Sequence, residues 1–166
     1  MISAFIIVAQ TLDGFISPLE HTNSTTWTSG ADKEFFKTRT KEAGVIIMGK
    51  TTFETIGKAL PDRKTIVYSE EPINIEGVQT TTLSPKDLLI QLEQEGYKEV
   101  AICGGTSIYS MFLNSGLVSK LYITLEPILF GAGIPLFKDV QQTKLSLVSS
   151  TPLDKNALLL EYKINI

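Results

Sequence analysis

The sequence predicts a three-layer α/β fold with a mostly parallel central sheet and antiparallel strands toward its C-terminus. Continuous apolar runs at residues 2–9, 45–48 and 100–103 are typical of strands covered on both faces. Segments with helical signals separate these runs, and strands that alternate with helices indicate parallel pairing. Near the C-terminus apolar residues alternate with polar ones, as in half-buried antiparallel strands. They are Leu145, Leu147, Leu158, Leu160 and Tyr162.

Local signals place helices between these strands. Ser29 precedes Asp32 by three positions, which resembles a capping box and predicts a helix to about Lys41. Ser84 followed by Pro85 predicts the start of a further helix, because serine caps helices and proline fits their first position. Further strands are expected at 64–69, 78–81 and 120–125.

The composition is that of an ordinary globular protein, because 43% of the 166 residues are hydrophobic and 20% are charged. A chain of this length can bury one sizeable core, so we expect a single domain over residues 1–166. The net charge of −3 gives no general attraction for nucleic acid or an anionic membrane, and we expect neither as a partner. The first apolar run is too short to span a bilayer and lacks a basic leader, so it is predicted to be a buried strand. The single cysteine fits a reducing setting, so a cytoplasmic location is expected.

The single cysteine and single histidine restrict the chemistry. Cys103 has no second thiol with which to form a disulfide, and together with His21 it leaves no zinc-binding set, so no metal is expected. Cys103 lies in an apolar strand, where a thiol is typically a small core residue. His21 lies in the polar segment 10–28, where we expect it to be solvent-exposed. That segment is longer than compact domains normally leave unstructured, which favours a functional loop.

Two glycine turns are candidate binding sites for an anion, because each follows a strand and precedes a helix. Glycine lets a backbone approach a phosphate closely, and a helix start offers unpaired N–H groups. Either turn alone is equally consistent with a tight structural connection. Two such turns in one small domain match the two ends of a dinucleotide. They are Gly49, Lys50, Thr51 and Thr52, and Gly104, Gly105, Thr106 and Ser107.

Asp32 and Arg63 are the candidate side chains for chemistry on a second ligand. Asp32 is either a solvated first-turn carboxylate or a carboxyl at an apolar pocket wall, since Phe35 and Phe36 follow it. In the pocket it could hold the amidine-like edge of a heterocycle and support proton delivery. Arg63 follows a Pro-Asp turn and is either a surface charge or a planar fork for a substrate carboxylate.

The order and spacing of short motifs over nearly the whole chain resemble the dihydrofolate reductase family, which includes the reductase domain of riboflavin-biosynthesis enzymes. In particular, Asp32 follows Trp27 by five positions, as the acidic residue of that family does. The motifs are Met1-Ile2-Ser3 with Ala9, Trp27-Thr28-Ser29-Gly30-Ala31-Asp32 with Phe36, Val45-Ile46-Ile47-Met48-Gly49-Lys50-Thr51-Thr52-Phe53-Glu54-Thr55-Ile56-Gly57, Leu60-Pro61-Asp62-Arg63, Gly104-Gly105 with Ile108-Tyr109, and Tyr122-Ile123-Thr124.

The resemblance implies a role for each matching residue. The implied catalytic residues are Asp32, Trp27, Thr124 and Tyr109. The implied substrate-binding residues are Ile7, Asp32, Phe36, Ile56, Leu60, Arg63 and Thr124. The implied cofactor-binding residues are Ala9, Gly49, Lys50, Thr51, Thr52, Ser69, Cys103, Gly104, Gly105, Thr106, Ser107, Ile108 and Tyr109. A cis peptide between Gly104 and Gly105 is also implied.

The implied activity is the NADPH-dependent reduction of 7,8-dihydrofolate to tetrahydrofolate, in a monomer or homodimer. Three departures from the family pattern keep alternatives open. Glu70 and Glu71 stand where the 2′-phosphate of NADPH is expected, which makes NADH the alternative cofactor. Lys33 replaces an apolar pocket residue. Residues 127–133 are more similar to the riboflavin-type reductases. The alternative functions are reduction of a ribosylaminopyrimidine and non-catalytic binding of a nucleotide or pterin.

Overall fold

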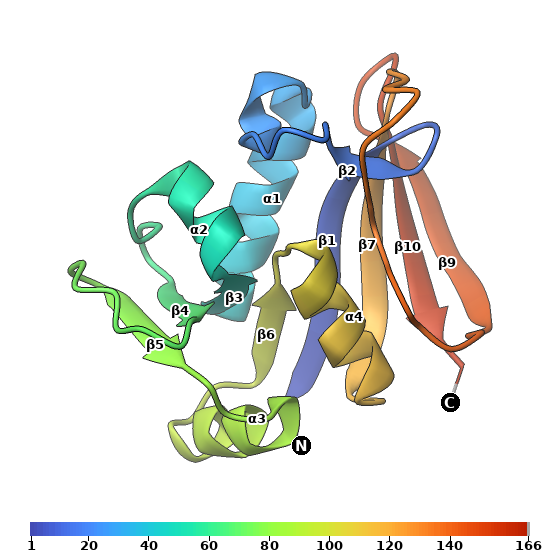
Figure 1. The fold of residues 1–166 in the computed structure, drawn as a ribbon. Coiled ribbons are helices and arrows are strands. Elements are labelled where there is room, and N and C mark those ends of the chain that lie inside the picture. The colour runs from blue at the N-terminus through green and yellow to red at the C-terminus, as the bar shows by residue number, and fades with distance from the viewer. Residues whose placement is uncertain (166) are drawn as a thin grey trace.

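A mostly parallel sheet of eight strands forms the centre of the computed structural model, which describes residues 1–165 (Figure 1). Its strands are β1 (Ser3–Thr11), β3 (Val45–Gly49), β4 (Lys64–Tyr68), β5 (Val78–Thr81), β6 (Glu99–Ile102), β7 (Val118–Glu126), β9 (Leu145–Pro152) and β10 (Leu158–Ile164). Their order is β5-β4-β3-β6-β1-β7-β10-β9. Only β10 runs antiparallel to its neighbours, β7 and β9. The predicted sheet with its antiparallel C-terminal end is confirmed.

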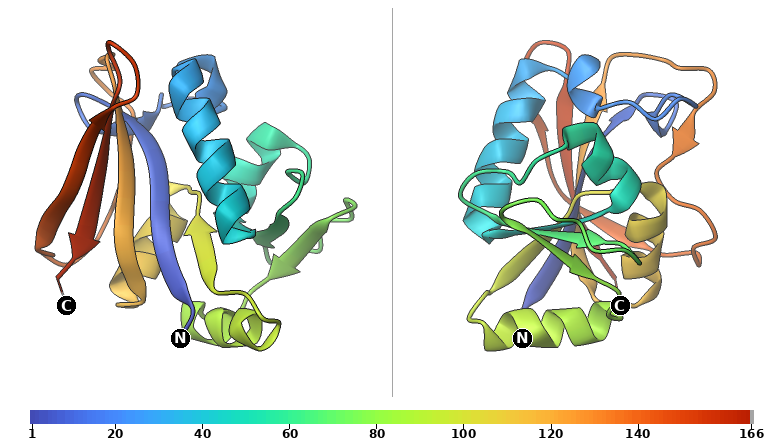
Figure 2. Two further views of the ribbon diagram at one scale, coloured as in Figure 1. Left: turned by 180° about the vertical axis from the view of Figure 1, so that it is seen from behind. Right: turned by 60° about the vertical axis from the view of Figure 1, so that its left-hand side comes forward.

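Helices cover both faces of the sheet, as the prediction of three layers requires (Figures 1 and 2). They are α1 (Gly30–Ala43), α2 (Lys50–Ile56), α3 (Pro85–Gln94) and α4 (Thr106–Asn114). The predicted caps are present, because the Ser29 hydroxyl accepts from the Asp32 N–H and the Ser84 hydroxyl accepts from the Asp87 N–H. Helix α1 ends at Gly44, whose φ of 78° favours glycine. None of these helices is long and apolar enough to cross a membrane.

The alternation of side chains along β1 divides the core into two layers. Ala4 and Ile6 pack on one face with residues of α3 and α4, whereas Phe5 and Ile7 pack on the other with residues of α1 and α2. All four side chains are at most 4% exposed. This two-sided burial explains why β1 appears in the sequence as a continuous apolar run.

The polar segment 10–28 is only partly the irregular loop that the sequence predicts. Strand β1 continues to Thr11, which pairs with Glu126 at the end of β7 and is fully buried despite its hydroxyl. A short strand β2 (Phe15–Ser17) then pairs with β8 (Ile134–Pro135) in a second, two-stranded sheet. A 3₁₀ turn, η1 (Ser24–Thr26), completes the segment. Hydrogen bonds to distant strands order these residues, and polar composition does not reveal such partners.

The prediction that β9 is half-buried is wrong. Leu147 is 56% exposed, and seven of the eight positions of β9 are exposed. The reason is that β9 is the edge strand, and the buried residues of both core layers extend only as far as β10.

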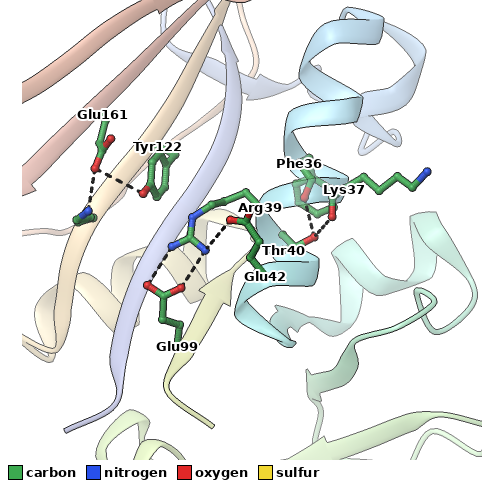
Figure 3. A network of polar contacts seen from close by, with 9 residues as sticks. Phe36, Lys37, Arg39, Thr40, Glu42, Glu99, Tyr122 and Glu161 are labelled. Carbon is green, nitrogen blue, oxygen red and sulfur yellow. Dashed lines mark hydrogen bonds and ion pairs between the residues drawn. The ribbon is translucent and has the colours of Figure 1, made fainter.

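A half-buried arginine connects α1 to the sheet (Figure 3). Arg39 donates to Glu99 of β6 through both terminal nitrogens, at 3.0 and 2.9 Å. Its guanidinium carbon lies 4.0 Å from the centroid of the Phe5 ring, which adds a cation–π contact. The exposed Glu42 is a more distant partner, at 3.8 Å. The pair with Glu99 therefore holds the middle of α1 against β1 and β6.

We predict that Glu99→Gln lowers the free energy of unfolding by about 1–2 kcal/mol, because it leaves the half-buried Arg39 charge without a carboxylate. The matched variant Glu42→Gln should change it by less than about 0.5 kcal/mol, since that ion pair is exposed. Urea unfolding followed by circular dichroism measures both. Equal losses in the two variants would show that the bidentate pair has no special role.

Candidate active site

A cavity of about 960 Å³ lies at the carboxyl ends of the parallel strands. Its walls include Ala9 of β1, Gly49 of β3 and Tyr68 of β4, together with the turn after β6. Helices α1, α2 and α4 contribute the remaining sides. This edge of a parallel sheet is where α/β proteins bind their ligands.

Most residues that the sequence singled out come together around this cavity. The lining includes Ile7, Ala9, Asp32, Phe36, Gly49, Lys50, Thr51, Thr52, Ile56, Leu60, Arg63, Cys103, Gly104, Gly105, Thr106, Ser107, Ile108 and Tyr109. Cys103, expected from the strand pattern to be a core residue, is half-buried at this wall, and burial raises the pKa of its thiol to about 12.

Three of the singled-out residues lie outside the lining. Thr124 is 1% exposed and lies beside Asp32. Trp27 packs edge-to-face on Phe130, with ring centroids 5.1 Å apart. The Ser69 hydroxyl is engaged with its own loop, since it donates to the Glu71 carbonyl at 2.6 Å and accepts from the Glu71 N–H at 3.2 Å.

The Asp32 carboxyl is set in the first turn of α1 and lines the cavity. Burial raises its pKa from 3.8 to about 6, because the charged form loses solvation. The Thr124 hydroxyl opposes this rise in pKa, Glu126 adds to it through its negative charge, and Lys33 opposes it through its positive charge. About half of Asp32 is therefore protonated near pH 6, and about a tenth of it at pH 7.

Strand β7 supplies the neighbours of Asp32, because every second side chain along the strand points to the α1 side of the sheet. Tyr122 packs with Phe35 on the α1 side of the sheet, and Thr124 and Glu126 follow at every second position on that side. Glu126 is 3% exposed and accepts from the N–H and the hydroxyl of Ser29. The sequence analysis missed Glu126, because a glutamate at the end of a strand normally indicates solvent.

The two glycine turns lie against each other. The Gly49 N–H donates to the Gly104 carbonyl at 2.8 Å. A Cβ atom at Gly49 would lie 3.0 Å from Ile108 Cγ1, and one at Gly105 would lie 3.2 Å from Thr52 Oγ1, so any larger residue would have to displace these side chains slightly and glycine is favoured at both turns. The peptide between Gly104 and Gly105 is cis, as the resemblance implied. The cavity wall here is bare backbone.

The phenol of Tyr109 fixes the α4 side of the cavity. Its hydroxyl donates to the Ile7 carbonyl at 3.0 Å, which connects the first turns of α4 to β1. Burial raises the pKa of Tyr109 well above its usual value, so the phenol is neutral. No side chain caps the start of α4, which leaves its first N–H groups without a side-chain acceptor.

One end of the cavity carries positive charge. Arg63 donates to the Thr40 hydroxyl at 2.8 Å and to the Pro61 carbonyl at 2.9 Å. Lys33 and Lys37, one turn apart on α1, and Lys58 after α2 also line the cavity. Within residues 1–165 these four cations form no ion pair with an acid. Such a surface favours an anionic ligand.

The segment after β2 passes beside the cavity and reaches α2. Asn23 donates to the Thr55 carbonyl at 3.2 Å, which holds the segment across the opening. His21 is exposed, as expected, but it also lines the cavity, which the sequence analysis did not anticipate. Ser17 at the end of β2 also lines the cavity, as do Thr22, Asn23, Ser24, Thr25 and Thr28 of this segment.

A parallel sheet with bare-backbone glycine turns and a buried acid at its carboxyl edge defines an α/β ligand-binding domain. Comparison of the sequence with family models identifies the family to which this domain belongs. The model described as dihydrofolate reductase matches residues 2–157, so the chain belongs to the dihydrofolate reductase family.

Two relatives and two solved structures illustrate the relationship. The dihydrofolate reductase of Buchnera aphidicola subsp. Baizongia pistaciae is 37% identical over 61% of this chain, and this match spans only 59% of that protein. The dihydrofolate reductase of Bacillus subtilis is 32% identical over 85% of each chain.

The solved structures share the fold at lower identity. A protein assigned to riboflavin biosynthesis from Shewanella sp. PV-4 has a TM-score of 0.85 at 19% identity, and the match covers 99% of this chain and 100% of that chain. The dihydrofolate reductase of Enterococcus faecalis complexed with NADP(H) and RAB-propyl has a TM-score of 0.76 at 23% identity, with 99% and 97% coverage.

The raised pKa of Asp32 predicts how stability depends on pH. Between pH 3.8 and about 6 the folded chain holds a proton that the unfolded chain has lost, so the contribution of Asp32 to stability falls as pH rises through this window. Asp32→Asn should therefore be more stable than the parent by about 3 kcal/mol at pH 8 and by little at pH 4. Urea unfolding at both values measures this. The exposed neighbour Glu34→Gln is the control, and a gain that does not depend on pH would contradict the prediction.

Proposed function

We propose that the chain reduces 7,8-dihydrofolate to tetrahydrofolate with NADPH, and that NADH is the alternative reductant. The observation that carries this proposal is the position of Asp32, a partly protonated carboxyl that lines a cavity between bare glycine turns and a cationic end. Membership of the dihydrofolate reductase family and the dihydrofolate reductases among the relatives support it.

The glycine turns fit a dinucleotide. The close contacts around Gly49 and Gly105 leave backbone where side chains would block a pyrophosphate, and the start of α4 offers N–H groups to its oxygens. Lys50, Thr51 and Thr52 would hold the adenosine phosphate side. When bound, a reduced nicotinamide dinucleotide supplies the hydride. The Enterococcus faecalis reductase, which was solved with NADP(H), supports this assignment.

Asp32 would supply the proton that the reduction needs. The pteridine gains a hydride at a ring carbon and a proton at the adjacent ring nitrogen. The hydride from the nicotinamide brings both electrons and one hydrogen, so one further proton must come from another donor. A carboxyl with a pKa of about 6 carries that proton in part of the molecules near neutral pH. Thr124 would orient the carboxyl, Trp27 would order the neighbouring loop, and Tyr109, which lines the cavity, would lie near the two reacting rings.

The remaining walls would select the rest of the substrate. Phe36, Ile56 and Leu60 form an apolar passage for an aminobenzoyl group, and Arg63 would bind the glutamate carboxylate. The uncompensated cations around Arg63 would equally bind the phosphate of a ribosylaminopyrimidine. Similarity in fold to the Shewanella protein favours that substrate as the second candidate.

Measuring NADPH oxidation with dihydrofolate and with the phosphorylated ribosylaminopyrimidine decides between these substrates. We expect turnover of dihydrofolate, and kcat/KM should fall as pH rises through about 6 because Asp32 loses its proton. Asp32→Asn should lower kcat about a hundredfold or more, while the dissociation constant of NADPH changes less than about threefold.

Glu34→Gln is the matched control, because Glu34 lies two residues after Asp32 on α1 and is exposed to solvent. This variant should keep the parent activity. Turnover of the pyrimidine alone would replace the folate assignment with the riboflavin-type reaction. Binding of NADPH without turnover of either substrate would indicate a non-catalytic binding protein.

The preference between NADPH and NADH should depend on Glu71. Its carboxylate lies 3.8 Å from the Lys50 ammonium, the cation proposed to meet the phosphate of the adenosine, and so competes with it. Glu71→Gln should raise the ratio of kcat/KM for NADPH over NADH by about threefold to fivefold, the size of one exposed ion pair. The exposed Glu76→Gln, in the same β4–β5 connection, is the control. An unchanged ratio would place the 2′-phosphate away from Lys50.

A further inference from the structure

Glu126 is a buried carboxylate that has no role in the reaction as proposed above. It ends β7, is 3% exposed and has no cationic partner within the described residues. A buried carboxylate is costly unless hydrogen bonds compensate for its lost solvation. Both of its bonds come from one residue, since Glu126 Oε1 accepts from the Ser29 N–H at 2.9 Å and from the Ser29 hydroxyl at 2.8 Å.

These contacts connect Glu126 to Asp32. Ser29 is the N-cap of α1, and its Oγ accepts from the Asp32 N–H at 3.2 Å while its hydroxyl proton is donated to Glu126. The serine hydroxyl has only one proton to donate. As long as Glu126 takes that proton, the Asp32 carboxylate cannot.

Helix α3 shows what the same sequence pattern does without such a partner. Both helices begin with serine followed three positions later by aspartate. At α3 the Ser84 hydroxyl accepts from the Asp87 N–H and donates to the Asp87 carboxylate at 2.6 Å, so the aspartate closes on its own cap. At α1 the corresponding proton goes to Glu126, and the Asp32 carboxyl lines the cavity.

We propose that Glu126 is a positioning residue: by taking the Ser29 hydroxyl proton it keeps Asp32 out of its own helix cap and available to the substrate. This inference rests on the proposed function only for the identity of the substrate. The release of Asp32 from the cap is a property of the chain itself.

The surroundings of Asp32 leave Glu126 as the one acid that opposes its ionisation among the groups acting on it. Thr124 of β7 and Lys33 of α1 both favour the carboxylate. Tyr109 of α4 is neutral, and His21 of the loop after β2 is exposed. The negative charge of Glu126 therefore offsets the effect of the Lys33 charge on the pKa of Asp32. Lys33 lies next to Asp32 in the sequence.

The test uses two substitutions that separate position from charge. Glu126→Leu removes both, so Asp32 should close on Ser29 as Asp87 does on Ser84, and kcat/KM should fall about thirtyfold. Glu126→Gln keeps an oxygen acceptor for Ser29 and removes the charge. It should retain kcat at low pH within about threefold and lower the apparent pKa of the site by about half a unit to one unit.

A second substitution separates loss of positioning from damage to the fold in Glu126→Leu. Adding Ser29→Ala to Glu126→Leu removes the hydroxyl that would capture Asp32, so the double variant should recover activity to within about threefold of Ser29→Ala alone. A double variant that is worse than either single variant would overturn the proposal, because it would indicate independent structural damage.

A measurement without turnover separates this inference from the proposed function. Carbon-13 NMR titration of the aspartate carboxyl carbons, with Asp32→Asn to assign the resonance, reports the protonation of Asp32 directly. The midpoint should fall in Glu126→Gln and in Glu126→Leu and stay unchanged in Glu161→Gln, which lies in the distant pair with Lys120. An unchanged midpoint in both Glu126 variants would refute the inference, whereas a shifted midpoint without dihydrofolate turnover would refute only the proposed substrate.

Discussion

The arrangement of the cavity depends on the contact between strand β7 and helix α1. Polar side chains at every second position of β7 meet α1 at successive levels, with Glu126 at Ser29 and Thr124 at Asp32. Lower on the helix, Arg39 lies 5.3 Å from the Tyr122 ring and continues the same contact. Buried polar groups that lack partners are costly, so each of these pairs fixes the rotation of α1 about its axis. That rotation determines whether Asp32 lines the cavity or faces solvent.

The sequence predicts the parts of this arrangement that depend on neighbouring residues. The caps at Ser29 and Ser84 and the strand-to-helix turns at Gly49 and Gly104 are encoded within a few positions, and the structure has them where expected. The bond between Glu126 and Ser29 joins residues 97 positions apart, and no local pattern contains it. The same limit explains the wrong prediction for β9, whose exposure depends on its place at the edge of the sheet.

Charge is distributed unevenly along the cavity, which gives its two ends different chemistry. The turn of Gly104 and Gly105 at the start of α4 presents backbone groups without a charged side chain, and the turn at Gly49 carries Lys50, which is paired with Glu71, whereas Arg63, Lys33, Lys37 and Lys58 line the cavity without an acidic partner within the described residues. A ligand with an anionic tail and a neutral heterocycle would be oriented by this distribution alone, with the heterocycle at the acid. Both substrates proposed above meet this description, so the charges would orient either one and would not by themselves distinguish them.

The contrast between α1 and α3 shows how a carboxylate is made available for chemistry. At α3 the aspartate stabilises its own helix by closing the cap, which is the favourable local arrangement. At α1 that local stabilisation is given up, and a second carboxylate is buried instead, with like charges close together. Both changes make the folded state less stable at neutral pH than a closed cap would, and neither improves the core. Such a cost is expected where the freed group has a function, which is why the geometry of Ser29 is as informative about the site as the carboxyl of Asp32 itself.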